Sequence, residues 1–195
     1  MKNLFFLSIV TLLNFDCFAQ NSHTLFLTYA LSNPEPVYNG HVDGGAGYKP
    51  EASNSFGIRY LMKSTKIVTL ETGIEYSNYH FKLDYVDDPR INIPYIQKTA
   101  KLISIPVYAH LTFLRYFFIN GGAIVDTEIN KKENEINKQS GIGFGLGAGL
   151  KFKFKHVAIF ANSFFERHAL IGSSQQGTRR SLINSGGRLG IGYSF

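Results

Sequence analysis

The 195-residue chain contains no tryptophan, a single cysteine and no long apolar run. A transmembrane helix needs about 20 consecutive apolar residues, and no segment of the chain supplies them, which excludes a helical membrane span. One cysteine excludes an internal disulfide framework. The net charge of +6 comes from basic residues that are scattered rather than clustered, which disfavours a nucleic-acid partner.

The first residues have the pattern of a secretory signal peptide. Lys2 precedes an apolar stretch at residues 4–13, and Cys17 and Ala19 are the small residues that a signal peptidase reads. We therefore expect cleavage after Ala19, so that residues 1–19 are removed and residues 20–195 form one domain without cysteine. Lipidation at Cys17 is the alternative, but residues 14–16 are not the small and branched residues that it requires.

Glycine and aromatic residues are abundant, with 19 glycines, 17 phenylalanines and 11 tyrosines. Many lie in segments where every second residue is apolar, the pattern of a strand with one apolar face. In residues 141–155 the glycines and lysines take one parity and the apolar residues take the other. We interpret such glycines as places where a barrel bends or where interior bulk must be spared. The expected strands are residues 22–32, 52–63, 66–80, 98–113, 115–126, 141–155, 156–168 and 181–195.

Short and long connections alternate between these strands. The connections near residues 64–65, 114 and 155–156 are tight turns, whereas residues 33–51, 81–97, 127–140 and 169–180 are long and polar. This alternation of short and long connections, with an even number of strands, predicts an all-β fold: an eight-stranded antiparallel up-and-down transmembrane β-barrel. An open sheet would leave unpaired backbone groups in hydrocarbon, so the last strand should pair with the first. We expect the barrel in the outer membrane, with both termini in the periplasm.

The carboxyl end supports the same fold. Leu189, Ile191, Tyr193 and Phe195 alternate with polar or small residues, as in a strand with one lipid-facing side. We expect Tyr193 and Phe195 to act as the insertion signal that the barrel-assembly machinery recognises.

Charged residues occupy positions opposite the apolar face. A buried charge needs a partner, and the interior of an eight-stranded barrel is just wide enough for side chains. We therefore predict a lumenal charge network that plugs the barrel; a proton or ion path is the alternative. Its members are Arg59, Glu71, Glu75, His110, Lys151, Lys153, Glu166 and Arg188.

Pro106 interrupts the fourth expected strand. Proline cannot donate to a β-ladder, and a closed barrel has no edge on which to place it, so we expect a local bulge there.

Three segments carry a family resemblance: LISIPV at residues 102–107, FFINGGA at 117–123 and GLGAGL at 145–150. This series resembles the PorT-like outer membrane beta-barrel family of Bacteroidota over nearly the whole mature chain. The resemblance implies a small outer-membrane barrel. Through some relatives it also implies an accessory role in secretion or barrel assembly.

No catalytic, cofactor or metal site is predicted. Ser163, Glu166 and His168 lie close in sequence, but Ser163 shares the parity of the apolar face, so a triad would not converge. His110 and Thr112 come nearest to the His–Ser pair of an outer-membrane lipid deacylase, but a threonine stands where that enzyme has its serine nucleophile. The six histidines are spread singly, without the spacing of a zinc site.

Binding through the long connections is the function that remains to be considered. Basic residues there are candidates for contact with lipopolysaccharide phosphates: Lys131, Lys132, Arg179 and Arg180. We predict an integral outer-membrane barrel with a structural, adhesive or accessory assembly or secretion role. Its partners would be outer-membrane lipid, including lipopolysaccharide, and another envelope protein. A narrow ion or small-solute channel is one alternative, and a lipid-modifying enzyme is a second.

Overall fold

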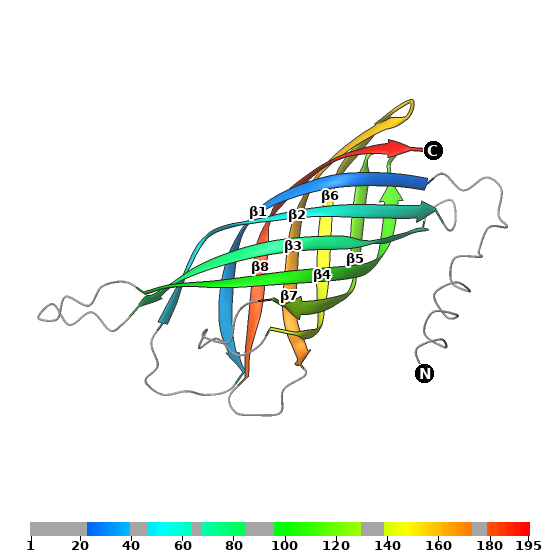
Figure 1. The fold of residues 1–195 in the computed structure, drawn as a ribbon. Helices are drawn as coiled ribbons and strands as arrows, with labels where there is room; N and C mark the ends of the chain where they lie inside the picture. Colours follow the sequence, from blue (N-terminus) through cyan, green and yellow to red (C-terminus); the bar gives the residue numbers. More distant parts are fainter. Residues whose placement is uncertain (1–22, 40–46, 64–67, 85–95, 130–138, 173–178) are drawn as a thin grey trace, which may run out of the picture.

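The computed structural model describes residues 23–39, 47–63, 68–84, 96–129, 139–172 and 179–195, which form a closed antiparallel barrel (Figure 1). Each strand pairs with its neighbour in sequence, and β8 pairs with β1. The predicted eight-stranded up-and-down barrel is therefore confirmed. The strands are β1 (His23–Asn39), β2 (Gly47–Lys63), β3 (Val68–Asp84), β4 (Ile96–Phe113), β5 (Phe117–Glu128), β6 (Gly141–Phe154), β7 (Val157–Gly172) and β8 (Arg179–Ser194). Within these described ranges, no helix has the length and apolar character to span a membrane.

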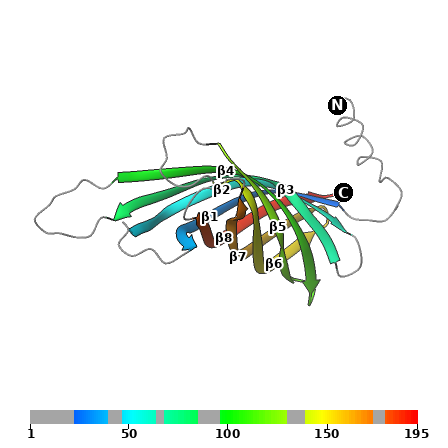
Figure 2. The same cartoon turned by 90° about the horizontal axis from the view of Figure 1, so that it is seen from below.

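The seam between β1 and β8 closes the barrel along its whole height. The pairing runs from Thr24 opposite Ser194 to Asn39 opposite Arg179. At the end that holds both chain termini, His23 N donates to Phe195 O and Phe195 N donates to His23 O, both at 3.0 Å. We call this end the turn end, because the turns at residues 114–116 and 155–156 lie there, and the opposite end the far end (Figure 2).

Several expected boundaries were wrong. β1 continues to Asn39 and β3 to Asp84, so parts of the two expected connections at 33–51 and 81–97 are strand. Arg179 and Arg180, expected in a connection, begin β8. Proline-rich and polar composition suggested loops, but the ladder with β8 carries β1 through Pro34 and Pro36.

The β4–β5 turn is also longer than expected, because Arg115 and Tyr116 lie in it and not in a strand. Leu114 and Arg115 adopt φ values of 48° and 69°. Positive φ at consecutive residues gives a hairpin turn whose twist matches that of the flanking strands.

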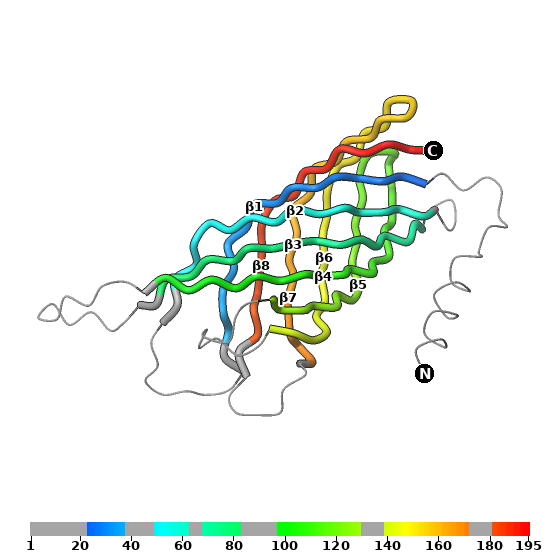
Figure 3. Tube along the Cα trace, in the orientation of Figure 1, coloured from blue at the N-terminus to red at the C-terminus, as the bar shows by residue number. Residues whose placement is uncertain are grey.

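The barrel wall divides towards the far end. β1 pairs with β2 only as far as Ser32 opposite Ser53 and then stays with β8, whereas β2, β3 and β4 continue together to Gly47, Asp84 and Ile96. The tube in Figure 3 shows β2–β4 extending to the left while β1 and β8 turn downward. A three-stranded sheet therefore projects beyond the rest of the wall.

The prediction of a bulge at Pro106 was wrong. The β3–β4 ladder keeps one register from Thr72–Val107 to Glu75–Ser104, and Pro106 lies opposite Ile124 in an unbroken β4–β5 ladder. On the β3 side the pairs opposite Ile105 and Pro106 are absent, so a gap in the ladder accommodates the missing donor. The register shifts occur instead in the β2–β3 ladder, between Glu51 and Asn54, and in the β6–β7 ladder, between Ile142 and Phe144.

The outer face of the barrel is apolar around its circumference. On β8, Leu189, Ile191 and Tyr193 are 62%, 58% and 55% exposed. Soluble proteins rarely expose apolar patches of this extent, whereas transmembrane barrels carry an apolar band of this kind. The outward side chains therefore form a lipid-facing belt.

The seam register can be tested with paired cysteines in the mature chain. Leu27 lies opposite Ile191 and both face outward. Residues opposite one another lie about 4.5–5.5 Å apart at Cα, within disulfide range, whereas diagonal neighbours lie about 7–8 Å apart. We expect Leu27→Cys with Ile191→Cys to form an intramolecular disulfide under mild oxidation, and Leu27→Cys with Leu189→Cys to form far less. Non-reducing gel mobility measures this; the reverse preference would contradict the register.

Candidate functional site

The lumen is filled by three layers of side chains. Phe26, Leu61 and Ala158, with Phe160 against them, form a turn-side cluster. Towards the far end lies a far-side cluster of Tyr79, Phe81, Ala100, Leu102 and Leu182. Between the two clusters lies a polar layer, because Glu166 stands six residues beyond Phe160 on β7 and Arg188 six residues from Leu182 on β8.

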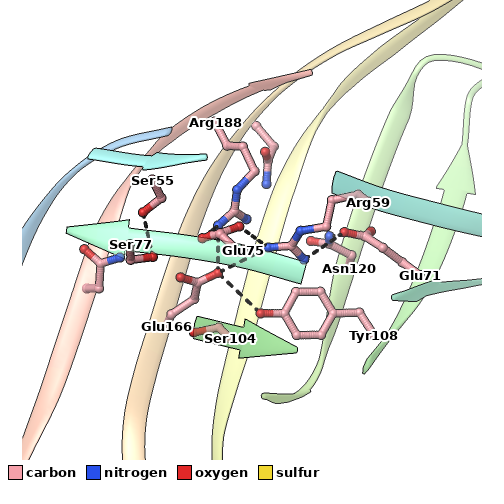
Figure 4. A network of polar contacts seen from close by, with 12 residues as sticks. Ser55, Arg59, Glu71, Glu75, Ser77, Ser104, Tyr108, Asn120, Glu166 and Arg188 are labelled. Carbon is pink, nitrogen blue, oxygen red and sulfur yellow. Dashed lines mark hydrogen bonds and ion pairs between the residues drawn. The ribbon is translucent and has the colours of Figure 1, made fainter. Parts of the chain in front are cut away.

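Two arginines and two glutamates form the centre of the polar layer (Figure 4). Arg59 Nη2 lies 2.6 Å from Glu75 Oε2, and Arg188 Nη2 lies 2.9 Å from both Glu75 Oε1 and Glu166 Oε1. Arg59 Nη2 also approaches Glu166 Oε1 at 4.0 Å. All four side chains are at most 4% exposed, so they are shielded from solvent and hold one another in a fixed geometry.

A branch of the polar layer runs towards the turn end. Arg59 Nη1 lies 3.3 Å from Glu71 Oε1, and Glu71 Oε2 accepts from Asn120 Nδ2 at 2.8 Å. His110 Nδ1 lies 3.0 Å from the same oxygen, and Lys151 Nζ lies 3.2 Å from His110 Nε2. An ammonium group can only donate, so Lys151 donates to Nε2, and the other ring nitrogen, Nδ1, donates to Glu71.

A second branch runs towards the far end. His168 Nδ1 lies 2.9 Å from Asp126 Oδ2, and Ser104 Oγ donates to Asp126 Oδ1 at 2.6 Å. His168 Nε2 lies 3.2 Å from the Tyr79 hydroxyl, which also accepts from Asn184 Nδ2 at 3.1 Å. The Nε2 atom is 3.9 Å from a Glu166 carboxylate oxygen, which links this branch to the centre.

Opposite charges nearly balance within the polar layer. Buried charges are tolerated when partners compensate them, and the imidazoles of His110 and His168 each contact one of the carboxylates. The carboxylates are Glu71, Glu75, Asp126 and Glu166, and the cations are Arg59, Lys151 and Arg188.

The structure brings together seven of the eight residues proposed for the lumenal charge network. Lys153 is the exception, because it is exposed near the turn end. The sequence reasoning missed Tyr108, Asn120, Asp126 and His168 as members. Alternation alone could have found them, because each shares the inward parity of its strand.

Glycines make room for the largest lumenal side chains. A Cβ atom at Gly145 would overlap the Tyr108 hydroxyl, and one at Gly190 would overlap the Phe160 ring. The glycine faces of β6 and β8 therefore accept bulk from other strands, since Tyr108 comes from β4 across the lumen and Phe160 from the adjacent β7.

Little space remains in the polar layer. A gap lined by Glu71, His110 and Lys151, among others, has a volume of about 10 Å³, room for about one water molecule. The guanidinium groups of Arg59 and Arg188 stay protonated, so the hydrogen-bonded contacts cannot relay a proton past them. The arrangement is suited to filling and stiffening the barrel.

The geometry offers little for catalysis or metal binding. Ser163 faces outward, whereas Glu166 and His168 face the lumen, so these three residues do not converge. Across the described residues, no group of three or more His, Cys, Asp or Glu side chains is arranged to hold a metal ion.

The remaining candidate residues are those proposed for loop contacts and for insertion. Lys131 and Lys132 fall outside the described residues, and only the backbone of Arg179 and Arg180 is described. At the turn end, Tyr193 stacks on His156 with ring centroids 5.6 Å apart, and Phe195 stacks on His23 at 5.9 Å.

The fold is similar to that of known outer-membrane proteins. No protein-family model matches the chain, and no curated protein matches it. Among solved structures, the outer membrane protein OprG of Pseudomonas aeruginosa superimposes with a TM-score of 0.58 at 10% identity, covering 90% of this chain and 96% of OprG. The chain has an outer-membrane barrel fold.

Two further structures agree. Ail, the attachment invasion locus protein of Yersinia pestis, gives a TM-score of 0.50 at 16% identity, covering 90% of this chain and 99% of Ail. The outer membrane protein AlkL gives 0.50 at 10% identity, with 90% of each chain covered. At these identities the likeness extends to the fold and not to an activity.

The cost of breaking the polar layer can be measured. Glu75→Gln removes the charge that two buried arginines share, and losing one partner of a buried ion pair costs about 3–5 kcal/mol. We expect a loss of this size in the free energy of unfolding, measured by urea titration of the refolded barrel. Glu51→Gln is the matched control, because Glu51 pairs with the half-exposed Lys82 and an exposed pair contributes about 0–1 kcal/mol. Equal losses in the two variants would contradict the polar layer's contribution to stability.

Proposed function

We propose that the chain is an integral outer-membrane barrel with a closed lumen, which acts as a structural, adhesive or accessory component of the envelope. The observation that carries the proposal is the polar layer, held between the turn-side and far-side clusters. With the lumen filled, the wall, its ends and its projecting sheet remain for interaction. Loops and rims on a rigid scaffold are where recognition usually occurs.

The channel alternative draws support from the continuous polar contacts between Lys151 and Asp126. An ion that followed them would have to displace the ion pairs of Arg59 and Arg188 and cross both apolar clusters. Each step has a large desolvation cost, and the closed lumen is the simpler assignment.

The proposed location rests on the sequence and the fold together. Residues 1–19 would act as a cleaved export signal, and the turn end, with both termini, would face the periplasm. Tyr193 and Phe195 would act as the insertion signal for the barrel-assembly machinery. Outer-membrane lipid, including lipopolysaccharide, and a second envelope protein are the proposed partners.

Two likenesses bear on the role. The resemblance to the PorT-like outer membrane beta-barrel family supports an accessory part in secretion or assembly, and the name of Ail, an attachment invasion locus protein, supports adhesion. Cross-linking in intact cells, followed by identification of the captured protein, would separate these roles. An envelope secretion or assembly component would favour the accessory role, and a host surface molecule would favour adhesion.

Planar-bilayer recording tests the closed lumen. We expect no reproducible current steps from the purified wild-type protein, because the polar layer and both apolar clusters block the path. A porin recorded under the same conditions controls for sensitivity. Wild-type steps that change in amplitude after Arg59→Ser and Arg188→Ser would place the current in the lumen and favour the channel alternative.

Removing Phe195 tests the insertion signal. The deletion removes one of the two rings stacked on His23 and both backbone hydrogen bonds between Phe195 and His23. We expect several-fold less protein in the outer-membrane fraction by quantitative immunoblot. Phe195→Tyr, which keeps an aromatic ring at the end, is the control. Normal membrane levels of the deletion variant would contradict the role assigned to this residue.

A further inference from the structure

We propose that an apolar groove on the outer face of β4–β7, together with basic residues at the turn end of the same strands, binds an anionic glycerophospholipid. The acyl chains lie in the groove, and the phosphate lies at the exposed residues Arg115, Lys153 and Lys155, which we call the basic rim. The inference rests on the proposed outer-membrane location, because that location places the turn end at the periplasmic leaflet, which consists of glycerophospholipids.

The groove lies on the lipid-facing side of the wall. It has a volume of about 640 Å³, and its lining is mostly apolar. One row of paired residues crosses it, from Leu111 on β4 to Ile119, Ala148 and Ser163 on the next three strands. An empty hollow in hydrocarbon would forfeit dispersion contacts, so an acyl chain is the occupant that fits the groove.

The basic rim lies at the turn end of the same four strands. Arg115 is in the β4–β5 turn, Lys155 is in the β6–β7 turn and Lys153 is near the end of β6, and all three are exposed. Lys151 N donates to Tyr116 O at 2.7 Å, so the β4–β5 turn adjoins the end of β6. The three basic residues therefore share one sector of the wall.

The distance between the groove and the basic rim matches the depth of one membrane leaflet. Lys153 stands five residues beyond Ala148 on β6, or about 16 Å along the strand at about 3.3 Å per residue. Half of a hydrocarbon core of about 30 Å is about 15 Å. A phospholipid whose phosphate lies at Lys153 therefore has acyl chains long enough to reach the groove.

Exposed aromatic rings stand next to the basic rim. Phe113 stacks on Phe117 with ring centroids 6.0 Å apart, and Tyr116 lies against Phe152 at 5.2 Å. All four side chains are exposed. Aromatic residues of transmembrane barrels lie at the membrane–water interface, so these rings place the basic rim at the level of the lipid head groups.

Among the described residues, no acidic side chain is paired with the basic rim. The flanking segments 102–125 and 136–165 contain neither Asp nor Glu. Glu71, the carboxylate on this side of the polar layer, is buried and bonded to Arg59 and His110. The basic rim therefore presents positive charge that an anionic ligand would compensate.

The groove and the charge together favour an anionic lipid over an acidic protein segment. A phosphatidylglycerol head group has one net negative charge, and charge-assisted hydrogen bonds to phosphate are about twice as strong as neutral ones. A zwitterionic head group adds an ammonium group, which the basic rim repels. An acidic segment of a periplasmic protein would compensate the charge but would leave the groove without an apolar partner.

Native mass spectrometry of the refolded mature chain in an uncharged detergent measures the binding. The probes are phosphatidylglycerol and phosphatidylethanolamine with identical acyl chains, and glycerol 3-phosphate, which has the phosphate without the chains. The basic-rim variant combines Arg115→Gln, Lys153→Gln and Lys155→Gln. Its matched control removes the same charge from the far end, with Lys49→Gln, Lys98→Gln and Lys101→Gln.

A second pair of variants tests the groove. Ala148→Leu adds bulk to the groove, and Ala123→Leu makes the same change at an exposed position of β5 outside it. We expect Ala148→Leu to weaken the binding of both phospholipids several-fold and Ala123→Leu to leave it unchanged. Equal effects of the two substitutions would overturn the role of the groove.

We expect the wild type to bind phosphatidylglycerol at least about tenfold more tightly than phosphatidylethanolamine, since each basic residue near an anionic lipid contributes about a fivefold factor in affinity. The basic-rim variant should lose this preference, and its control should keep it. Equal losses in the variant and its control, or glycerol 3-phosphate binding as tight as phosphatidylglycerol, would overturn the proposal. Equal binding of both phospholipids by the wild type would also overturn it and would favour an acidic protein segment as the partner. Different gel mobilities of unheated and boiled samples establish that each variant is folded.

The lipid site and the location can fail separately, because binding by the refolded chain does not depend on where the protein resides in the cell. Membrane fractionation reports the location. A protein that fractionates with the outer membrane but shows no preference for phosphatidylglycerol would overturn only the lipid site. A protein that shows the preference but fractionates elsewhere would overturn only the proposed location.

Discussion

The pairing of backbone groups in hydrocarbon is the constraint on which the rest of this structure depends. An unpaired N–H or C=O inside a membrane costs several kcal/mol, so the wall must close. Closure between β1 and β8 follows, with His23 and Phe195 joined by two backbone hydrogen bonds at the turn end. The even strand count and the placement of both termini at one end are consequences of that closure.

Closure in turn determines the chemistry of the interior. Eight strands enclose a space that side chains can fill, so charges on inward positions must neutralise one another. Glu75 does so by accepting from Arg59 and Arg188 together, and Glu166 shares Arg188. The apolar clusters on either side keep water from competing with these contacts. The result is a polar layer whose central ion pairs are enclosed although they are made of charged groups.

Alternation in the sequence was enough to predict the barrel, the seam and the direction of most side chains. It could not predict which Glu contacts which Arg, because neighbours across the lumen depend on the register and tilt of all eight strands. It also misplaced the ends of β1 and β3, because Pro34, Pro36 and polar residues suggested loops where pairing continues. The bulge expected at Pro106 failed because a missing pair is a smaller disturbance than an inserted residue.

The match between glycines and large rings in the lumen has a consequence for how such a chain can change over generations. Tyr108 occupies the volume that a side chain at Gly145 would need, and Phe160 occupies that of Gly190. Neither residue of a pair can be replaced by a larger one unless the other is replaced by a smaller one. A single substitution at these positions would therefore disrupt the packing of the lumen. Variation in this interior would have to proceed by paired exchanges between strands, and related sequences would record it as correlated swaps of small and large residues.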